Sequence, residues 1–235
     1  GSRLFQPWEG GEGGPLGQWV RSQLALGRKA LRSHRGNEAQ TSNRKSEIRN
    51  QKISQRLLTS AATYFRNALI APRNLGEAKH LLANQSDIHF WLGCALDLSG
   101  DKQQAKQHWL AAAKFKGDFQ DMSVRVFSEM SYYSALAWEK LGRRAKANNL
   151  FRDLLAYAKR LQKSEVKIDY FATSLPTMLL FEDNLQSRQE TTALFLQAQA
   201  QFGLGKRSEA KKLLATVLQR DPNHTLAADF DSQNN

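Results

Sequence analysis

The sequence predicts an all-α fold built from stacked antiparallel helical hairpins. Three stretches share one sparse pattern, in which a glycine is followed by alanine five positions later and by a large apolar residue nine positions later. The three sets are Gly100, Ala105 and Trp109; Gly142, Ala147 and Phe151; and Gly205, Ala210 and Leu214. Glycine lets the chain reverse between two helices, and alanine lets those helices approach closely. No stretch alternates apolar and polar residues between turn signals, so we expect almost no β-strand.

This spacing is that of the tetratricopeptide repeat, a helix–turn–helix unit of about 34 residues. We therefore expect a tetratricopeptide-repeat superhelix of helical hairpins, with repeats near 86–119, 128–161 and 191–224. The turn glycines of the last two repeats lie farther apart than one repeat. The surplus residues, about 162–190, are too apolar for a loop and predict an extra helical element.

The N-terminal part of the chain predicts one degenerate repeat. Apolar residues recur at helical spacing from Pro15 to about Ser33, and helical spacing resumes at Leu57. The basic, polar tract at about 37–54 separates the two helices and is predicted to be a disordered insertion. The predicted organisation is thus a Gly-rich extended lead-in at 1–14, the split repeat at 15–70, three repeats at 71–224 and a polar, frayed tail at 225–235.

The net charge of +12 raises the question of a nucleic-acid partner. Residues 28–56 hold nine basic and two acidic groups, a net +7, and no aromatic side chain that could stack on a base. We interpret this tract as a solvated loop, with a phosphate-binding arm as the alternative, and a nucleic-acid partner is not expected. No apolar run approaches the roughly 20 residues that span a bilayer, so no membrane partner is expected. A single cysteine, Cys94, fits a reducing, cytoplasmic compartment.

Catalytic chemistry is hard to assemble from this sequence. The five histidines show no metal-ligand spacing, and there is no phosphate loop, nucleophile elbow or paired Cys-x-x-Cys. We therefore predict no enzyme activity, no catalytic residue, no metal site and no cofactor.

The inner face of the predicted superhelix is one candidate binding site, because the first helix of each repeat lines it. Aromatic side chains interleaved with carboxylates suit a polar or cationic peptide, or a sugar; simple solvated helix faces are the alternative. The candidate groove residues are Asp87, Phe90, Asp97, Glu129, Tyr132, Tyr133 and Phe195, with Cys94, Leu136, Glu139 and Gln199 at neighbouring groove positions.

The Gly-rich lead-in is the other candidate site. Trp8, Glu9 and Glu12 lie among glycines that let a backbone pass close to a ligand. A tryptophan that stacks on a sugar ring, with carboxylates that accept from its hydroxyls, would form a glycan site. The alternative is a linker that tucks Trp8 into the first helix pair.

Five strings resemble a family of bacterial proteins of unassigned function. They are Arg-Leu-Phe-Gln-Pro-Trp-Glu-Gly-Gly-Glu-Gly-Gly at 3–14, Asn-Leu-Gly-Glu-Ala-Lys-His-Leu at 74–81, Ile-His-Phe-Trp-Leu-Gly at 88–93, Lys-Ile-Asp-Tyr-Phe-Ala-Thr-Ser-Leu-Pro at 167–176 and Phe-Glu-Asp-Asn-Leu at 181–185. Members carry a β-rich domain similar to galactose mutarotase, followed by tetratricopeptide repeats. The resemblance covers nearly all of the chain except 37–54 and maps to the C-terminal repeat region only.

The resemblance implies that this chain is the repeat part of a larger bacterial protein whose β-domain is absent here. The sequence then favours a non-enzymatic protein-interaction scaffold that binds a protein or peptide, or that β-domain. The alternative is the accessory region of a carbohydrate-active or carbohydrate-binding protein, with Trp8, Glu9 and Glu12 contributing to a glycan site.

Overall fold

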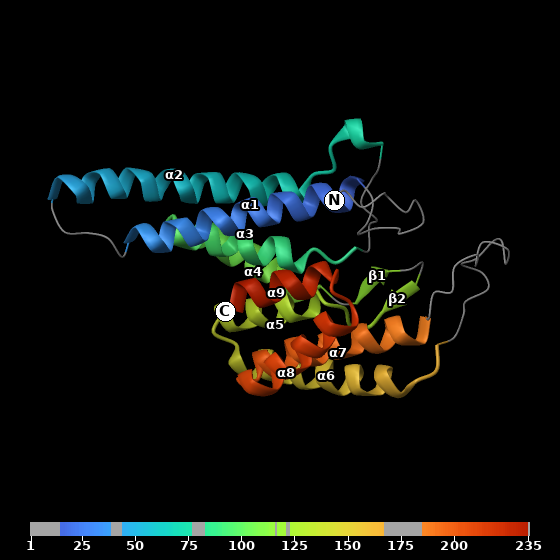
Figure 1. The fold of residues 1–235 in the computed structure, drawn as a ribbon. Coiled ribbons are helices and arrows are strands. Elements are labelled where there is room, and N and C mark those ends of the chain that lie inside the picture. Colours follow the sequence, from blue (N-terminus) through green and yellow to red (C-terminus); the bar gives the residue numbers. More distant parts are fainter. Residues whose placement is uncertain are drawn as a thin grey trace. The chain divides into compact units, whose positions relative to one another are not determined.

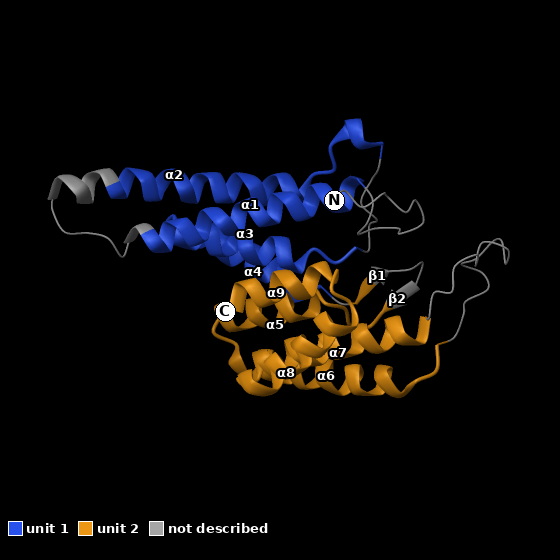
Figure 2. Cartoon of the chain, in the orientation of Figure 1, with its two compact units in different colours: residues 1–115 blue, residues 116–235 orange. Residues whose placement is uncertain are grey.

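A computed structural model describes residues 15–38, 44–76, 83–115, 117–120, 123–166 and 185–234. The predicted all-α class is confirmed, because the described chain is a succession of antiparallel helical hairpins with one short β-hairpin (Figure 1). The chain divides into two compact units, residues 1–115 and residues 116–235 (Figure 2). The Gly-rich lead-in, 1–14, lies outside the described residues.

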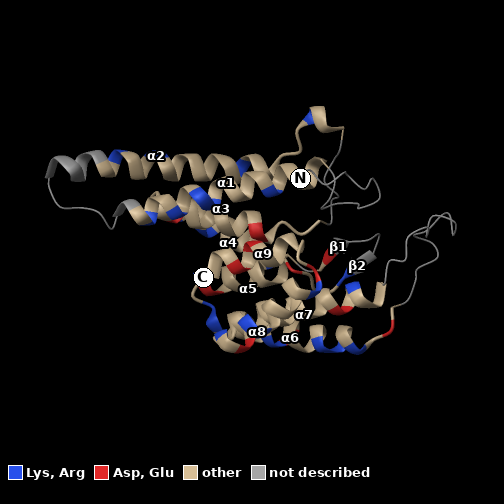
Figure 3. Ribbon diagram, in the orientation of Figure 1, with Lys and Arg blue, Asp and Glu red and all other residues tan. Residues whose placement is uncertain are grey.

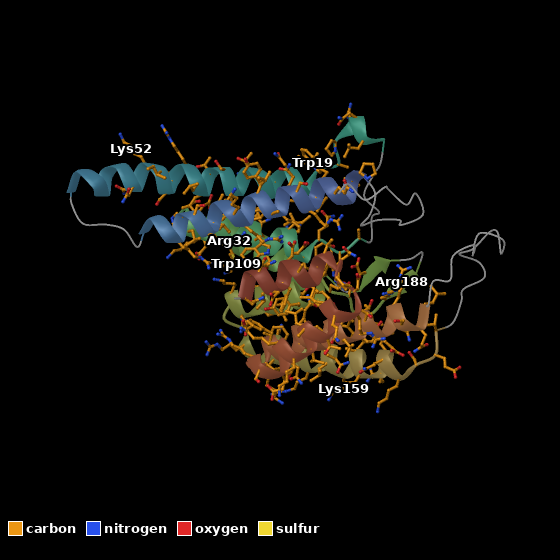
Figure 4. All side chains as sticks on the ribbon, viewed as in Figure 1. Trp19, Arg32, Lys52, Trp109, Lys159 and Arg188 are labelled. Atoms are coloured by element: carbon orange, nitrogen blue, oxygen red, sulfur yellow. The ribbon has the colours of Figure 1, made fainter. Side chains whose placement is uncertain are left out.

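In unit 1, the part of the chain that the structure describes forms two helical hairpins. Its elements are α1 (Pro15–Glu38), α2 (Arg44–Leu69), the 3-10 turn η1 (Arg73–Leu75), α3 (Ser86–Leu98) and α4 (Lys102–Lys114). Leu31 of α1 and Phe65 of α2 are buried, and a Cβ added at Gly27 of α1 would lie 2.4 Å from Cε1 of Phe65. Trp19 of α1 donates from its indole Nε1 to the backbone oxygen of Asn67 at 3.3 Å (Figure 4). These contacts hold α1 against the C-terminal half of α2.

The α3–α4 hairpin covers the residues of the first predicted repeat. Gly100 turns the chain with φ of 89°, in the left-handed region that favours glycine. The Asp101 carboxylate then accepts from the backbone N–H of Gln104 and so caps α4. The two helices are in close contact, since a Cβ added at Gly93 would lie 2.5 Å from Nε1 of Trp109.

The prediction of a disordered insertion at 37–54 is wrong for residues 44–54, which form the first turns of α2. These turns contain arginine, lysine, glutamine and glutamate, which are good helix formers. A helix that is nucleated by packing elsewhere gains one backbone hydrogen bond for each further residue. The packed part of α2 can therefore extend into a tract with almost no apolar stripe. Residues 39–43 lie outside the described residues.

The described residues of unit 2 form a short β-hairpin followed by five helices. The elements are β1 (Asp118–Gln120), β2 (Ser123–Arg125), α5 (Ser131–Lys140), α6 (Arg144–Lys163), α7 (Leu185–Gly203), α8 (Arg207–Arg220) and α9 (Thr225–Asn234). The strands pair antiparallel, with Asp118 opposite Arg125. Helices α5–α6 and α7–α8 cover the second and third predicted repeats. Leu154 and Ala158 of α6 pack against Leu196 and Ala200 of α7 in the core.

The structure differs from the sequence prediction at two places in unit 2. The tail, predicted to be frayed, is helical from 225 to 234, and it buries Phe230. Of the extra element predicted at 162–190, residues 162–163 belong to α6 and residues 185–190 to α7. Residues 167–184 lie outside the described residues. Within the described residues, no helix is long and apolar enough to cross a membrane.

Candidate functional site

The best-defined candidate site is a surface of unit 2 formed by the first helices of its two repeat hairpins. We call it the α5–α7 face and define it by Tyr132 of α5 and by Phe195, Gln199 and Phe202 of α7. Tyr132, Phe195 and Gln199 are predicted groove residues. In the structure this face is covered by α9, the segment that the sequence predicted to be frayed (Figure 1).

A single aromatic side chain holds α9 to the face. The Phe230 ring lies 5.2 Å from the ring of Tyr132, 5.9 Å from that of Phe195 and 5.6 Å from that of Phe202, measured between centroids. All three contacts are edge-to-face, the arrangement that aromatic rings prefer. Phe230 is 2% exposed, Tyr132 5% and Phe195 1%. Phe230 is therefore an anchor seated in an aromatic socket.

His224 immediately precedes α9 and links this helix to the same socket. Its Nδ1 accepts a hydrogen bond from the backbone N–H of Ala227 at 3.2 Å, and its ring centroid lies 4.9 Å from that of Phe195. Burial lowers the pKa of His224 from its ordinary value, although Glu129 and Asp221 act in the opposite direction. The neutral ring thus caps the first turn of α9, and protonation at Nδ1 would remove that acceptor.

The polar groups of this region are incompletely paired. Gln199 is 2% exposed, and its Nε2 donates to the backbone oxygen of Glu129 at 3.2 Å. Its Oε1 is buried without a hydrogen-bond partner, as is Nε2 of Gln233 on α9. A buried polar atom left unpaired costs about 1–3 kcal/mol. One buried polar atom on α7 and one on α9 are therefore left unpaired while α9 is docked.

The attachment of α9 is correspondingly modest. Only Ala227 and Phe230 of this helix are buried hydrophobic residues. Burying one phenylalanine side chain stabilises by about 1.5–3 kcal/mol, which the unpaired polar atoms partly offset. A ten-residue helix is marginal in water by itself. We conclude that α9 is held on the face by a few kcal/mol at most.

The electrostatics of the socket are those of a neutral surface with a charged rim. Burial raises the pKa of the Tyr132 hydroxyl well above its ordinary value, so this group stays protonated. The guanidinium of Arg207 lies 5.4 Å from the centroid of the Phe202 ring. A cation at that distance is attracted by the ring face. The socket therefore selects an apolar ring, with a positive group at its edge.

The other predicted groove residues lie elsewhere. Glu129 and Tyr133 of unit 2 are buried, and Tyr133 contacts Tyr132 edge-to-face at 5.4 Å. In unit 1, Phe90 is buried and packs edge-to-face on Trp91, while Asp87 accepts from the backbone N–H of Ile88 at 2.7 Å. The half-buried residues of the same helix include Asp97 and Cys94. The predicted loop site, Trp8, Glu9 and Glu12, lies outside the described residues.

Sequence reasoning missed Phe202, His224 and Phe230 as residues of the site. A signal was available, because Asp221-Pro222 is followed by apolar residues at helical spacing, Ala227 and Phe230. The helical pattern was not recognised because it has few apolar residues and is surrounded by polar ones.

A second arrangement, in unit 1, pairs two histidines of the α3–α4 hairpin. Nδ1 of His89 and Nδ1 of His108 are 2.9 Å apart, so one nitrogen donates and the other accepts. Burial lowers the pKa of His108, and the nearby Arg66 lowers it further. Within the described residues, no group of three His, Cys, Asp or Glu side chains could hold a metal ion.

The nine basic residues of 28–56 all lie on α1 or α2 in the structure. Residues 15–36 and 50–69 contain no acidic residue, and Lys and Arg occur along both α1 and α2 (Figure 3). Lys52 of α2 and Arg32 of α1 are exposed at the surface (Figure 4). The prediction against a nucleic-acid partner rested partly on the basic tract being an irregular loop. Residues 44–54 are helical, so that reason does not hold for them. The lack of aromatic residues at 28–56 stands.

Comparison with known proteins bears on the C-terminal hairpin. A tetratricopeptide-repeat family model matches residues 192–224, which include most of α7 and all of α8. No solved structure matches the chain. The match and the helical hairpins together show a tetratricopeptide-type region, a type of region that generally mediates protein–protein interaction.

We expect acid to destabilise the docked α9. Because the pKa of His224 is lowered in the folded protein from its ordinary value of 6.5, the unfolded state takes up the proton first as pH falls. The stabilisation is present above about pH 6.5 and is lost as pH falls through the folded pKa. Thermal melting measured from about pH 7.5 to 5 should therefore show a falling melting temperature for the wild type.

The variant His224→Asn is the matched control for this titration. Asparagine keeps an acceptor at the start of the helix but does not titrate, so its melting temperature should fall less over the same range. His108, whose pKa is also lowered, accounts for part of the remaining slope. Identical pH profiles for the two proteins would show that His224 does not titrate in this way.

Proposed function

We propose that the chain is a non-enzymatic protein-interaction module that binds partner segments on its repeat hairpins. The observation that carries the proposal is α9, which is seated on the α5–α7 face by the Phe230 anchor. That face thus has the shape and chemistry to hold a helix. The tetratricopeptide match at 192–224 includes the part of α7 that carries Phe195, Gln199 and Phe202, and it supports an interaction role in general.

The proposed partner is a protein or peptide, and one candidate is the β-rich domain of the family that the chain resembles. In that family the domain precedes the repeats, and the Gly-rich lead-in with Trp8 would lie between the two parts. The one cysteine of the chain, Cys94, is half-buried and fits the proposal of a reducing, cytoplasmic compartment.

The experiment adds the matching β-rich domain of a family member in trans and follows tryptophan fluorescence. We expect a saturable shift, because the indole of Trp8 would leave water on docking, and we expect Trp8→Ala to abolish it. Trp138→Phe is the matched control, since this half-buried indole lies under Lys146 in unit 2.

Two results would count against parts of the proposal. The first, the absence of any fluorescence shift or co-elution with the β-rich domain, would rule out that domain as the partner. The second is turnover of a glycoside by this chain alone that is lost in Glu9→Gln or Glu12→Gln. That second result would favour the carbohydrate-active alternative.

A further inference from the structure

We propose that the α5–α7 face is a binding site for an amphipathic helix of a partner protein, anchored by one aromatic side chain, and that α9 is the intramolecular occupant which this helix displaces. The inference rests on the proposed interaction function and deepens it. This proposal is tested on the α5–α7 face, whereas the proposed function is tested through Trp8 of the lead-in. Either proposal can therefore fail without the other.

The anchor defines the first requirement on the partner. The socket meets the Phe230 ring with three aromatic rings at 5.2 to 5.9 Å, all edge-to-face. A flat ring fits this arrangement, whereas a branched aliphatic chain cannot make the same contacts. The helical form follows from α9, which presents Ala227 and Phe230 to the protein from one side at a spacing of three residues.

The unpaired polar atom defines the second requirement. The Oε1 of Gln199 on α7 is an acceptor without a partner, in a side chain that is 2% exposed and whose Nε2 donates to the backbone oxygen of Glu129, just before α5. A partner helix that placed an N–H or O–H donor there would satisfy it. The α9 helix leaves Gln199 Oε1 unpaired and also buries its own Gln233 Nε2 without an acceptor. A better-matched helix can therefore compete with α9.

Displacement also requires that α9 leave without unfolding its unit. The helix carries only two buried hydrophobic residues, whereas α7 carries Ala193, Leu194, Phe195, Leu196, Ala198 and Ala200. Helix α9 is the last described element, and residues 221–224 alone join it to α8. Local opening of a terminal element with few buried contacts is the ordinary behaviour of folded proteins.

The test uses the full chain and a labelled peptide with the sequence of residues 221–234. The wild-type chain should bind this peptide weakly, because its own α9 occupies the face in most molecules. Phe230→Ala should strengthen binding at least about tenfold, since affinity scales with the fraction of molecules whose site is open. A peptide in which the phenylalanine is replaced by alanine should not bind either chain.

Matched substitutions then locate the binding surface. In the Phe230→Ala chain, Phe202→Ala should weaken peptide binding, because it removes one ring of the socket. Phe127→Ala is the control, since this half-buried ring packs on Tyr157 and the Leu154 cluster instead. Equal losses for the two substitutions, or equally weak binding to the wild-type and Phe230→Ala chains, would overturn the proposal.

Hydrogen exchange on the wild type decides the case in which Phe230→Ala does not fold. The amides of α9 should exchange at least about tenfold faster than the slowest amides of α7, through local opening. Exchange of α9 at the rate of α7 would show a fixed part of the core and would overturn the proposal. Peptide-dependent dimers would show instead that a second copy supplies the helix, which would also overturn it.

Discussion

Replacing Phe151 with alanine is expected to lower the free energy of unfolding of unit 2 by about 3–5 kcal/mol, the usual cost for a fully buried phenylalanine. Phe151 is 0% exposed. Its ring lies 5.7 Å from the Tyr132 ring and in direct contact with α7 at Gly203. The side chain therefore joins three helices, and its loss leaves a cavity that rigid helices fill only in part. Urea unfolding followed by circular dichroism measures the change.

The control for this prediction is Val126→Ala in the same unit. Val126 is 67% exposed, so its truncation should change the stability by less than about 0.5 kcal/mol. Similar losses for the two variants would mean that Phe151 is not at the centre of the packing.

The contact with Gly203 adds a test of the geometry itself. A Cβ at position 203 would lie 2.3 Å from Cε1 of Phe151, which no real side chain tolerates. Gly203→Ala should therefore destabilise unit 2, although alanine is the better helix former. Phe151→Leu removes Cε1, the ring atom that would clash with a Cβ at position 203. The double variant should then be less destabilised than the sum of the single variants, and strict additivity would argue against this contact.

The repeat hairpins could be predicted because their pattern reflects close packing. A turn with positive φ requires glycine at 100, 142 and 205, and the structure has all three in the left-handed region. The alanines five positions later are buried because two helix backbones approach there. Few residue types satisfy these constraints, so the positions of the turn glycines and buried alanines can be recognised from a single sequence.

The elements that escaped prediction are those whose residues carry little local information. The first turns of α2 are polar, and they are helical by extension from the packed turns that follow. The strands β1 and β2 have three residues each, too short for alternation to be seen. Helix α9 has two buried hydrophobic residues, and its position depends on the socket rather than on its own pattern.

Part of the candidate site could be predicted from the repeat pattern, and the helix that covers it could not. Tyr132 and Phe195 follow from repeat register, which places the first helices of neighbouring hairpins side by side. That register cannot show what covers them. The sequence therefore predicted an open groove, whereas the structure has a closed socket with Phe230 in it. Phe230 of the covering helix lies about 100 residues after Tyr132 and about 35 residues after Phe195 in the chain, so its contacts with them are tertiary.

Leucine at Ala105, Ala147 or Ala210 is expected to lower stability by about 1–3 kcal/mol at each position, the cost of overpacking. All three alanines are buried on the second helix of their hairpins, so the extra atoms of leucine must displace neighbouring groups. Leucine and alanine have similar helix propensity, so the effect would arise from packing and not from the backbone. Ala228→Leu is the matched control, because Ala228 is exposed on α9. Thermal melting of the four variants should separate three destabilised proteins from one that resembles the wild type. Equal effects at all four positions would contradict the repeat register, since only that register places the first three side chains between helices and leaves the fourth in water.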